Sequence, residues 1–195
     1  RIRPLTLPSL ARALAITGSG GPPVVSNAQF ETDAEGTTTP GGDFILAGSV
    51  VTGWRTFSVG GAGGKMTVTA AAGSSGKGIE IARDNAAGDS ALDRDNPALR
   101  IPIAPQARVY KLLVDARDGG VYGGTPLLNT GMQFSTTANN RGVGFDPVAV
   151  FETFGTTAVS DTGGWISTRF DVGSGAGRSV HVDNVRVTDV TSGID

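Results

Sequence analysis

The chain of 195 residues carries a single histidine, which limits the catalytic chemistry that it can perform. A catalytic triad, in which an imidazole activates a serine or cysteine nucleophile, would have to use His181. This histidine stands in an alternating stretch two residues before Asp183, and no nucleophile motif accompanies it. The chain also lacks cysteine, so a zinc site built from histidines and thiolates is excluded. A histidine that packs on a strand explains His181 without catalysis.

Other catalytic patterns are equally weak. Residues 73–78 are rich in glycine and contain a lysine, but they lack the spacing of a phosphate-binding loop. A glycosidase needs two carboxylates that face each other across a cleft. The four glutamates form no such constellation, and most aspartates stand in turn-like contexts. We therefore expect that the protein is not an enzyme.

Loop residues are better candidates for binding a ligand. Tyr122 stands among the glycines of residues 119–124, which cannot bury its ring locally. Sugar sites often combine an aromatic platform with a few polar groups, and Asp118, Asn140 and Arg141 offer such groups in nearby loops. These four residues are the candidate glycan-binding set. The alternative is that the Tyr122 ring packs between its loop and the body. The chain also has few aromatic platforms for sugars, since it contains two tryptophans and two tyrosines.

The first 25 residues differ in character from the rest. Their prolines favour extended backbone, Ser9 can cap a short helix over residues 10–16, and a Gly/Pro-rich linker follows. A helix of two turns is not stable alone in water. We therefore expect the arm to dock on a neighbouring subunit of a larger assembly, with docking on the body or a lack of fixed structure as alternatives. The apolar residues that would dock are Ile2, Leu5, Leu7, Leu10, Leu14 and Ile16.

The charge and hydropathy of the chain limit the classes of partner that it can bind. The net charge is −2, and residues 1–30 contribute three arginines and no acid, so the arm is +3 and the rest is −5. The body therefore has no basic footprint for nucleic acid. No run of 18 apolar residues occurs, so we expect no membrane insertion.

Composition predicts an all-β body. Glycine is abundant at 30 residues, helix formers are scarce outside short alanine runs, and turn residues interrupt the chain at short intervals. In the longest apolar-rich strand, Tyr110, Leu112 and Val114 should face the core. The segments 84–97 and 137–147 are expected to be loops. Strands are expected near 43–51, 54–59, 65–70, 77–82, 98–103, 108–117, 131–136, 147–154, 165–170 and 179–189.

Six short motifs follow one another in the order typical of a known family. They are Asn27 with Phe30-Glu31, Trp54, Ser75-Gly76-Lys77, Tyr110 through Ala116-Arg117, Trp165, and Asp183-Asn184-Val185. In this order the chain resembles the jelly-roll carbohydrate-binding modules, which are galactose-binding-like β-sandwiches of the family 4, 9 and 22 type. The resemblance covers residues 26–190.

The resemblance implies a fold and a set of ligands. The fold is a jelly-roll β-sandwich of two antiparallel sheets over residues 26–190, preceded by the arm (1–25) and followed by a short tail (191–195). Both tryptophans match positions that usually face the core. A structural Ca²⁺ often joins the first and last strands in such modules, and it would here be held by Glu31, the backbone of Gly76 and Lys77, and Asp183. The alternative is that Glu31 pairs with Lys77 or Arg186 while Asp183 holds a turn.

Together these expectations describe a protein that binds rather than catalyses. We expect a module that resembles carbohydrate-binding modules and is anchored by its arm to a larger assembly. The likeliest assembly is a phage or virus particle, in which the module would be a decoration, tail or adhesion protein. Its partners would be neighbouring subunits, through residues 1–25, and cell-surface or polysaccharide glycans, and its location extracellular or at the virion surface. The alternative is a carbohydrate-binding module of a secreted bacterial enzyme that degrades glycans.

Overall fold

The protein is described by a computed structural model in which twelve strands and one short 3-10 turn account for the regular structure of the described residues. No helix in this part of the chain is long and apolar enough to cross a membrane. The described residues are 23, 25–26, 28–38, 51–59, 64–83, 89–94, 97–103, 108–119, 130–136, 140–145, 147–160, 164–172 and 178–191.

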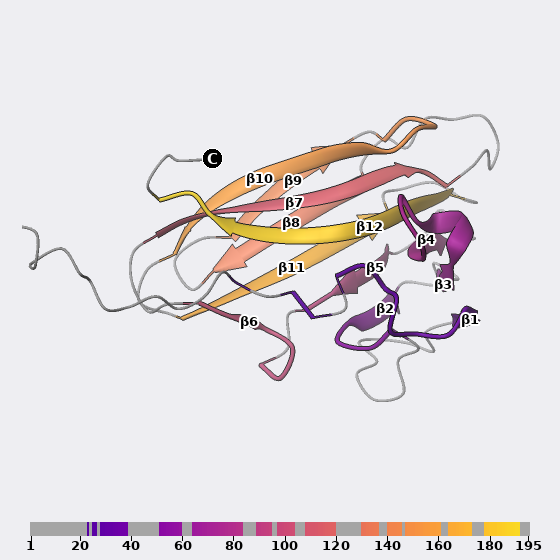
Figure 1. Cartoon of the computed structure of the whole chain (residues 1–195), viewed down its shortest axis with the longest axis horizontal. Helices are drawn as coiled ribbons and strands as arrows, with labels where there is room; N and C mark the ends of the chain where they lie inside the picture. The colour runs from indigo at the N-terminus through magenta and orange to yellow at the C-terminus, as the bar shows by residue number, and fades with distance from the viewer. Residues whose placement is uncertain are drawn as a thin grey trace, which may run out of the picture.

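The strands form two antiparallel sheets that lie face to face (Figure 1). The first sheet, called sheet A here, runs in the order β1 (Gly36–Thr38), β3 (Gly64–Thr69), β4 (Gly78–Arg83), β12 (Arg178–Asp189), β7 (Arg108–Asp118) and β10 (Glu152–Ser160). The second, sheet B, runs in the order β2 (Arg55–Val59), β5 (Asp89–Asp93), β11 (Trp165–Val172), β8 (Thr130–Thr136) and β9 (Asn140–Phe145), and β6 (Ile101–Pro102) pairs with β11. This is the predicted β-sandwich.

Alternation along the strands builds the core between the sheets. Tyr110, Leu112, Val114 and Ala116 of β7 are buried, as predicted for the first three, while the residues between them are only half-buried. The same alternation in β11 turns Ile166, Thr168, Phe170 and Val172 inward, so that the two sheets share one apolar core. Each sheet therefore presents its other set of side chains on an outer face.

The opening segment of the body lies against the last strand. The amide of Val185 donates to the carbonyl of Ala28 at 3.0 Å, and the ring centroids of Phe30 and Trp54 are 5.6 Å apart. Phe30 is completely buried although its φ is +55°, which is uncommon for a residue other than glycine. Burial of the ring in the core therefore holds the backbone in the left-handed region.

A buried arginine ties the start of the body to β5. Arg94 donates to the carbonyl of Leu99 and to the carbonyl and hydroxyl of Ser26, with distances from 2.9 to 3.0 Å. Its guanidinium lies 5.1 Å from the ring centroid of Trp54, and burial lowers the pKa of Arg94 to about 10. The opening segment is thus fixed to both sheets, to β12 through Val185 and to the end of β5 through Arg94.

Two predicted loops and one predicted strand were wrong in part. The expected polar loop over 84–97 contains β5, and the expected connection over 137–147 contains β9. The strand expected at 147–154 is β10, which begins at Glu152. Aspartates at both ends of β5 concealed the strand, because aspartate is depleted in strands. Asp93 is stabilised there by hydrogen bonds from Arg55 on β2, which is distant in the sequence. The expected strand at 43–51 lies almost wholly outside the described residues, with only Val51 among them.

Of the arm, the structure describes only Pro23 and Val25, and Val25 is buried in the core cluster of the body. The rest of the arm lies outside the described part of the chain. Ile2, Leu5, Leu7, Leu10, Leu14 and Ile16 all belong to it, so their docking stays a prediction. The boundaries that divide the chain into an arm, a sandwich over 26–190 and a tail also stay predictions.

The Phe30→Ala variant should lower the free energy of unfolding by about 3–5 kcal/mol, because it removes a fully buried ring and leaves a cavity beside Trp54. Chemical denaturation followed by tryptophan fluorescence measures this change. The matched control is Val150→Ala, in which an exposed apolar side chain is truncated and the stability should stay within about 0.5 kcal/mol of the parent protein. Equal losses in the two variants would contradict the assignment of Phe30 to the core.

Candidate ligand-binding surfaces

Asp183 joins β12 to the turn between β3 and β4. Its carboxylate is completely buried, and Oδ2 accepts from the amide and hydroxyl of Ser74 at 2.8 and 2.7 Å and from the amide of Ser75 at 3.3 Å. Oδ1 accepts from the amide of Asn184 at 2.6 Å. A carboxylate offers about four lone-pair sites, so these four donors satisfy it. Asp183 therefore holds the turn.

Glu31 and Lys77 link the opening segment to the same turn. Glu31 Oε1 accepts from the amide of Lys77 at 2.6 Å, and Lys77 Nζ donates to the carbonyl of Glu31 at 2.8 Å and also to the carbonyl of Asp33. Gly76 has a φ of +81°, and a Cβ at this position would collide with Glu31 Oε1. The predicted set Glu31, Gly76, Lys77 and Asp183 is thus brought together around one turn.

The donor set at this turn does not suit a calcium ion. Calcium takes six to eight oxygen ligands, whereas the Asp183 carboxylate is occupied by N–H and O–H donors and the Lys77 ammonium lies on the carbonyls of the opening segment. Within the described residues no group of three or more acidic, histidine or cysteine side chains could hold a metal. The contacts favour the alternative, in which Glu31 pairs with Lys77 and Asp183 holds a turn. Calcium stays a prediction of the resemblance.

A melting scan separates these two interpretations. If the contacts described above hold the turn, the melting midpoint in excess Ca²⁺ should equal that in a chelator, because a ligand raises stability only when it binds the folded state. A midpoint that rises with Ca²⁺ would instead establish the ion.

The Asp183→Asn variant should lose about 2–3 kcal/mol of folding free energy, because an amide cannot accept all four donors and leaves buried N–H groups unpaired. Denaturant unfolding gives this number, and Glu152→Gln, an exposed carboxylate on β10, is the control. A loss no larger than that of the control would show that the turn does not depend on Asp183.

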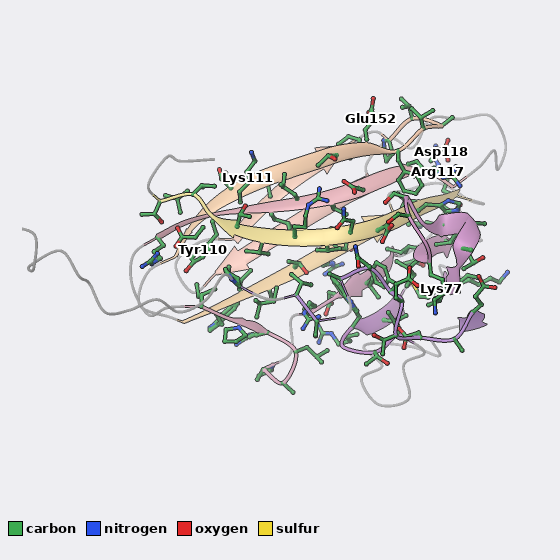
Figure 2. The ribbon with its side chains drawn as sticks, in the orientation of Figure 1. Lys77, Tyr110, Lys111, Arg117, Asp118 and Glu152 are labelled. Atoms are coloured by element: carbon green, nitrogen blue, oxygen red, sulfur yellow. The ribbon has the colours of Figure 1, made fainter. Side chains whose placement is uncertain are left out.

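The predicted glycan-binding residues are distributed over both sheets. Asp118 ends β7 in sheet A, where Figure 2 shows it beside Arg117 and far along the strand from Tyr110. Asn140 and Arg141 begin β9 in sheet B, and β8 ends and β9 begins toward the end of the sandwich where β7 starts (Figure 1). Tyr122 and the side chains of Asn140 and Arg141 lie outside the described part. The structure therefore does not place Asp118 next to Asn140, and binding by these residues stays a prediction.

The two tryptophans occupy different environments. Trp54 is buried between Phe30 and Phe170, with ring centroids 5.6 and 5.9 Å away, which confirms its predicted place in the core. Trp165 is only partly buried and lies outside the core cluster, because it alternates with the inward-facing Ile166 at the start of β11. The Arg100 guanidinium stacks 3.8 Å from the centroid of the Trp165 ring. The expectation that Trp165 faces the core was wrong.

A row of polar residues crosses the outer face of sheet B. Arg55 on β2 is paired with Asp93 on β5, which is paired with Arg169 on β11, so the three side chains lie on the same face. Arg55 Nε and Nη2 donate to the two oxygens of Asp93 at 2.7 and 2.8 Å. Asp171, two residues along β11, accepts from Arg169 Nε at 2.5 Å. These contacts fix the orientation of each planar group.

Part of this row remains open to solvent. The side chains of Arg169 and Asp171 are 27% and 22% exposed, whereas Asp93 is almost fully covered. Trp165 lies on the same face because residues 165, 167, 169 and 171 alternate with the core residues of β11. Asn140 is paired with Ser135 on β8, and Ser135 is paired with Ser167 on β11, so the position of Asn140 is in register with this face. An aromatic ring and fixed polar groups on one strand form a surface that suits a polar, ring-shaped ligand.

His181 on the outer face of sheet A is not available as a general base. Its Nδ1 accepts from Arg117 Nε at 3.1 Å, and its Nε2 lies 3.8 Å from Glu80 Oε1. The nearby His181 imidazole is the main cause of a lowered pKa at Glu80, against the opposing effect of burial. Both ring nitrogens therefore face charged groups, as expected for a histidine that packs on a strand.

Comparison of the sequence with protein-family models and with curated proteins finds no match. Comparison of the structure with solved structures does. A family 61 carbohydrate-binding module in complex with β-1,4-galactotriose has a TM-score of 0.58 at 15% identity, covering 86% of this chain and 98% of that one. A family 11 carbohydrate-binding module from Clostridium thermocellum, in complex with a mixed-linked tetrasaccharide, has a TM-score of 0.52 at 14% identity, covering 77% and 97%.

The chain has the jelly-roll fold of carbohydrate-binding modules. The same fold occurs within the enzymatically active domain of tailspike protein 4 of bacteriophage CBA120, at a TM-score of 0.59 and 12% identity. That match covers 86% of this chain and 21% of the tailspike chain, so this chain corresponds to one part of the larger protein.

Proposed function

We propose that this protein is a glycan-binding module that does not cleave its ligand. The observation that carries the proposal is the match to the family 61 module, because it extends over nearly the whole of a structure that holds a galactotriose. At 15% identity such a match concerns the fold, and function has to be argued from the site. The outer face of sheet B supplies that argument.

The glycan-binding surface that we propose consists of Trp165, Arg169, Asp171 and Arg55. Arg100 covers one face of the partly exposed indole, so the C–H groups of a sugar ring would stack on its other face. Guanidinium and carboxylate groups can donate to and accept from neighbouring hydroxyls, and their mutual hydrogen bonds hold them ready before the ligand arrives. Binding then requires less ordering of side chains, which favours affinity.

Titration of the protein with β-1,4-galactan, mixed-linkage β-glucan and xylan, followed by calorimetry, tests this surface. We expect the parent protein to bind at least one polysaccharide, and Trp165→Ala or Asp171→Ala to weaken binding about tenfold or more, because each removes a direct contact. The predicted loop contact is tested in the same way with Tyr122→Ala.

Two controls make this result specific. Lys65→Gln, at an exposed position on the outer face of sheet A, should leave binding unchanged, and the melting midpoint of each variant reports whether it is folded. No release of reducing ends is expected, because the protein is proposed to bind without hydrolysis. Unchanged affinity in all of the sheet B variants would refute the surface, and failure of the parent protein to bind any glycan would count against the function.

We further propose that residues 1–25 anchor the module to a larger assembly, of which a phage or virus particle is the likeliest, with the module at an extracellular or virion surface. Support comes from the apolar residues of the arm and from the presence of this fold in a phage tailspike. The alternative context is a secreted bacterial enzyme that degrades glycans, in which the same module would direct a catalytic domain to its substrate.

Deletion of residues 1–22 tests the anchor, because it removes the apolar docking residues and leaves the buried Val25 in place. The shortened protein should keep its cooperative melting transition and its glycan affinity but lose association with neighbouring subunits, because the arm supplies the docking residues. Light scattering and incorporation into native particles measure this. Unchanged assembly after the deletion would refute the anchoring role.

A further inference from the structure

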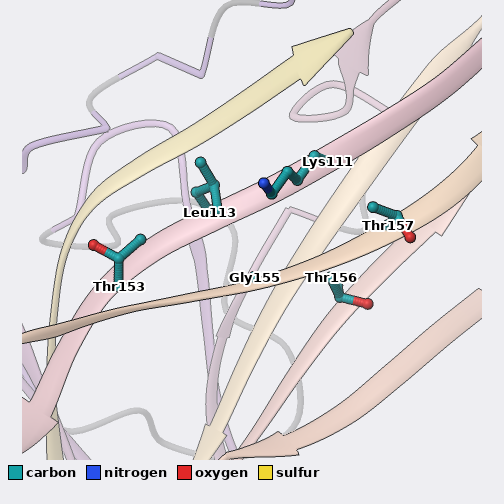
Figure 3. Close-up of a pocket in the computed structure, with 6 residues that line it drawn as sticks. All are labelled: Lys111, Leu113, Thr153, Gly155, Thr156 and Thr157. Carbon is teal, nitrogen blue, oxygen red and sulfur yellow. The ribbon is translucent and has the colours of Figure 1, made fainter. Parts of the chain in front are cut away.

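A hollow lies on the outer face of sheet A, on the other side of the sandwich from the glycan-binding surface. It has a volume of about 720 Å³, within the range of small-molecule sites. Lys111 and Leu113 project into it from β7, and β10 provides the opposite wall (Figure 3). The β10 residues that line it are Thr153, Gly155, Thr156 and Thr157.

Lys111 is the cation of this hollow, and its charge is not compensated by the described residues around it. Its ammonium makes no hydrogen bond or ion pair with any residue that the structure describes. Asp115, four residues along β7 on the same face, accepts instead from Thr153, Asn184 and Arg186. Burial alone would raise the pKa of Asp115, but these hydrogen bonds outweigh it and lower the pKa, so Asp115 remains charged and occupied.

The carboxylate of Asp189, on the neighbouring strand β12, is also occupied by donors of the protein. Asp189 accepts from the Arg108 guanidinium and from the amide and hydroxyl of Thr191. Thr188 is the direct neighbour of Lys111 on β12, and Thr157 is its neighbour on β10, so the positions that flank the ammonium carry hydroxyls rather than acids. An anion that enters the hollow is therefore not competing with a carboxylate of the protein for Lys111.

Gly155 leaves the space for a ligand. It is paired with Leu113 across β7 and β10, and a Cβ at this position would lie 2.7 Å from Leu113 Cδ2. A larger residue here would fill the middle of the hollow and displace the leucine. The half-buried Leu113 side chain thus forms an apolar floor between the ammonium on one side and the hydroxyl of Thr153 on the other.

We propose that this hollow is a second saccharide site, which binds an acidic sugar unit. The anionic group of the sugar, a carboxylate or a sulfate ester, pairs with the Lys111 ammonium, the threonine hydroxyls bind its hydroxyl groups, and Leu113 contacts its C–H face. The site is separate from the surface on sheet B and does not depend on glycan binding there.

Titration of the full chain with oligogalacturonate, with a sulfated oligosaccharide of the same length and with neutral β-1,4-galactotriose tests this proposal. An acidic oligosaccharide should bind, and Lys111→Gln should weaken this binding about tenfold or more, while Lys111→Arg retains it, because a charge-assisted hydrogen bond is lost only in the first variant. Gly155→Leu, which fills the hollow, should abolish the binding. Comparison of the two acidic ligands identifies which anionic group is preferred.

The control is Lys65→Gln, which removes an exposed lysine from the outer face of the same sheet but outside the hollow. This variant should bind as the parent protein does, and all variants should share its melting midpoint within a few degrees. Affinity for the acidic ligand should fall as salt is raised, since the contact is exposed to screening. Failure of both acidic ligands to bind, or equal affinity in the parent protein and Lys111→Gln, would overturn the second site, whereas loss of neutral glycan binding alone would concern only sheet B.

Discussion

The junction between the start, the middle and the end of the body depends on the buried carboxylate of Asp183. Asp183 has no exposed surface, and it is acceptable there because four donors from the chain surround it. Three of these donors belong to the turn between β3 and β4, more than 100 residues earlier in the sequence. Lys77 of the same turn contacts Glu31 of the opening segment. One anion thus organises the place where the start, the middle and the end of the body meet.

The two outer faces of the sandwich differ in their charged side chains, although both are formed by the outward-facing residues of antiparallel strands. On sheet B the charged groups neutralise each other, since Arg55 is paired with Asp93 and Arg169 with Asp171. On sheet A the carboxylates of Asp115 and Asp189 are likewise occupied, whereas the ammonium of Lys111 beside the hollow has no partner among the described residues. The two faces of the shared jelly-roll frame therefore differ in how their described charged groups are paired.

Regular patterns along the chain could be predicted from the sequence. Contacts between residues that are far apart in the sequence could not. The alternation of Tyr110, Leu112 and Val114 identified the inner face of β7, and the order of six short motifs predicted the sandwich. The interpretation in which Asp183 holds a turn and Glu31 pairs with Lys77 was also open from the sequence. The charged row on sheet B was not, because Arg55 and Asp93 are 38 residues apart and no local pattern joins them.

The sequence also did not predict backbone conformations and side-chain orientations that differ from the usual preference of the residue. Asn184 has a positive φ, which asparagine tolerates, but Phe30 shares this feature without any signal in its surroundings. Trp165 matched a position that faces the core in the resembling family, yet it starts β11 on the outer face. Both results are set by tertiary packing, which a single sequence does not reveal.

The position of β12 has a consequence for biosynthesis. This strand lies between β4 and β7 in the middle of sheet A, so the sheet cannot close until residues 178–189 have left the ribosome. Until then the edges of β4 and β7 stay unpaired, and unpaired edges invite association between nascent chains. Closure of sheet A therefore waits for its last strand in the sequence, and the two open strand edges have to be shielded until β12 has emerged.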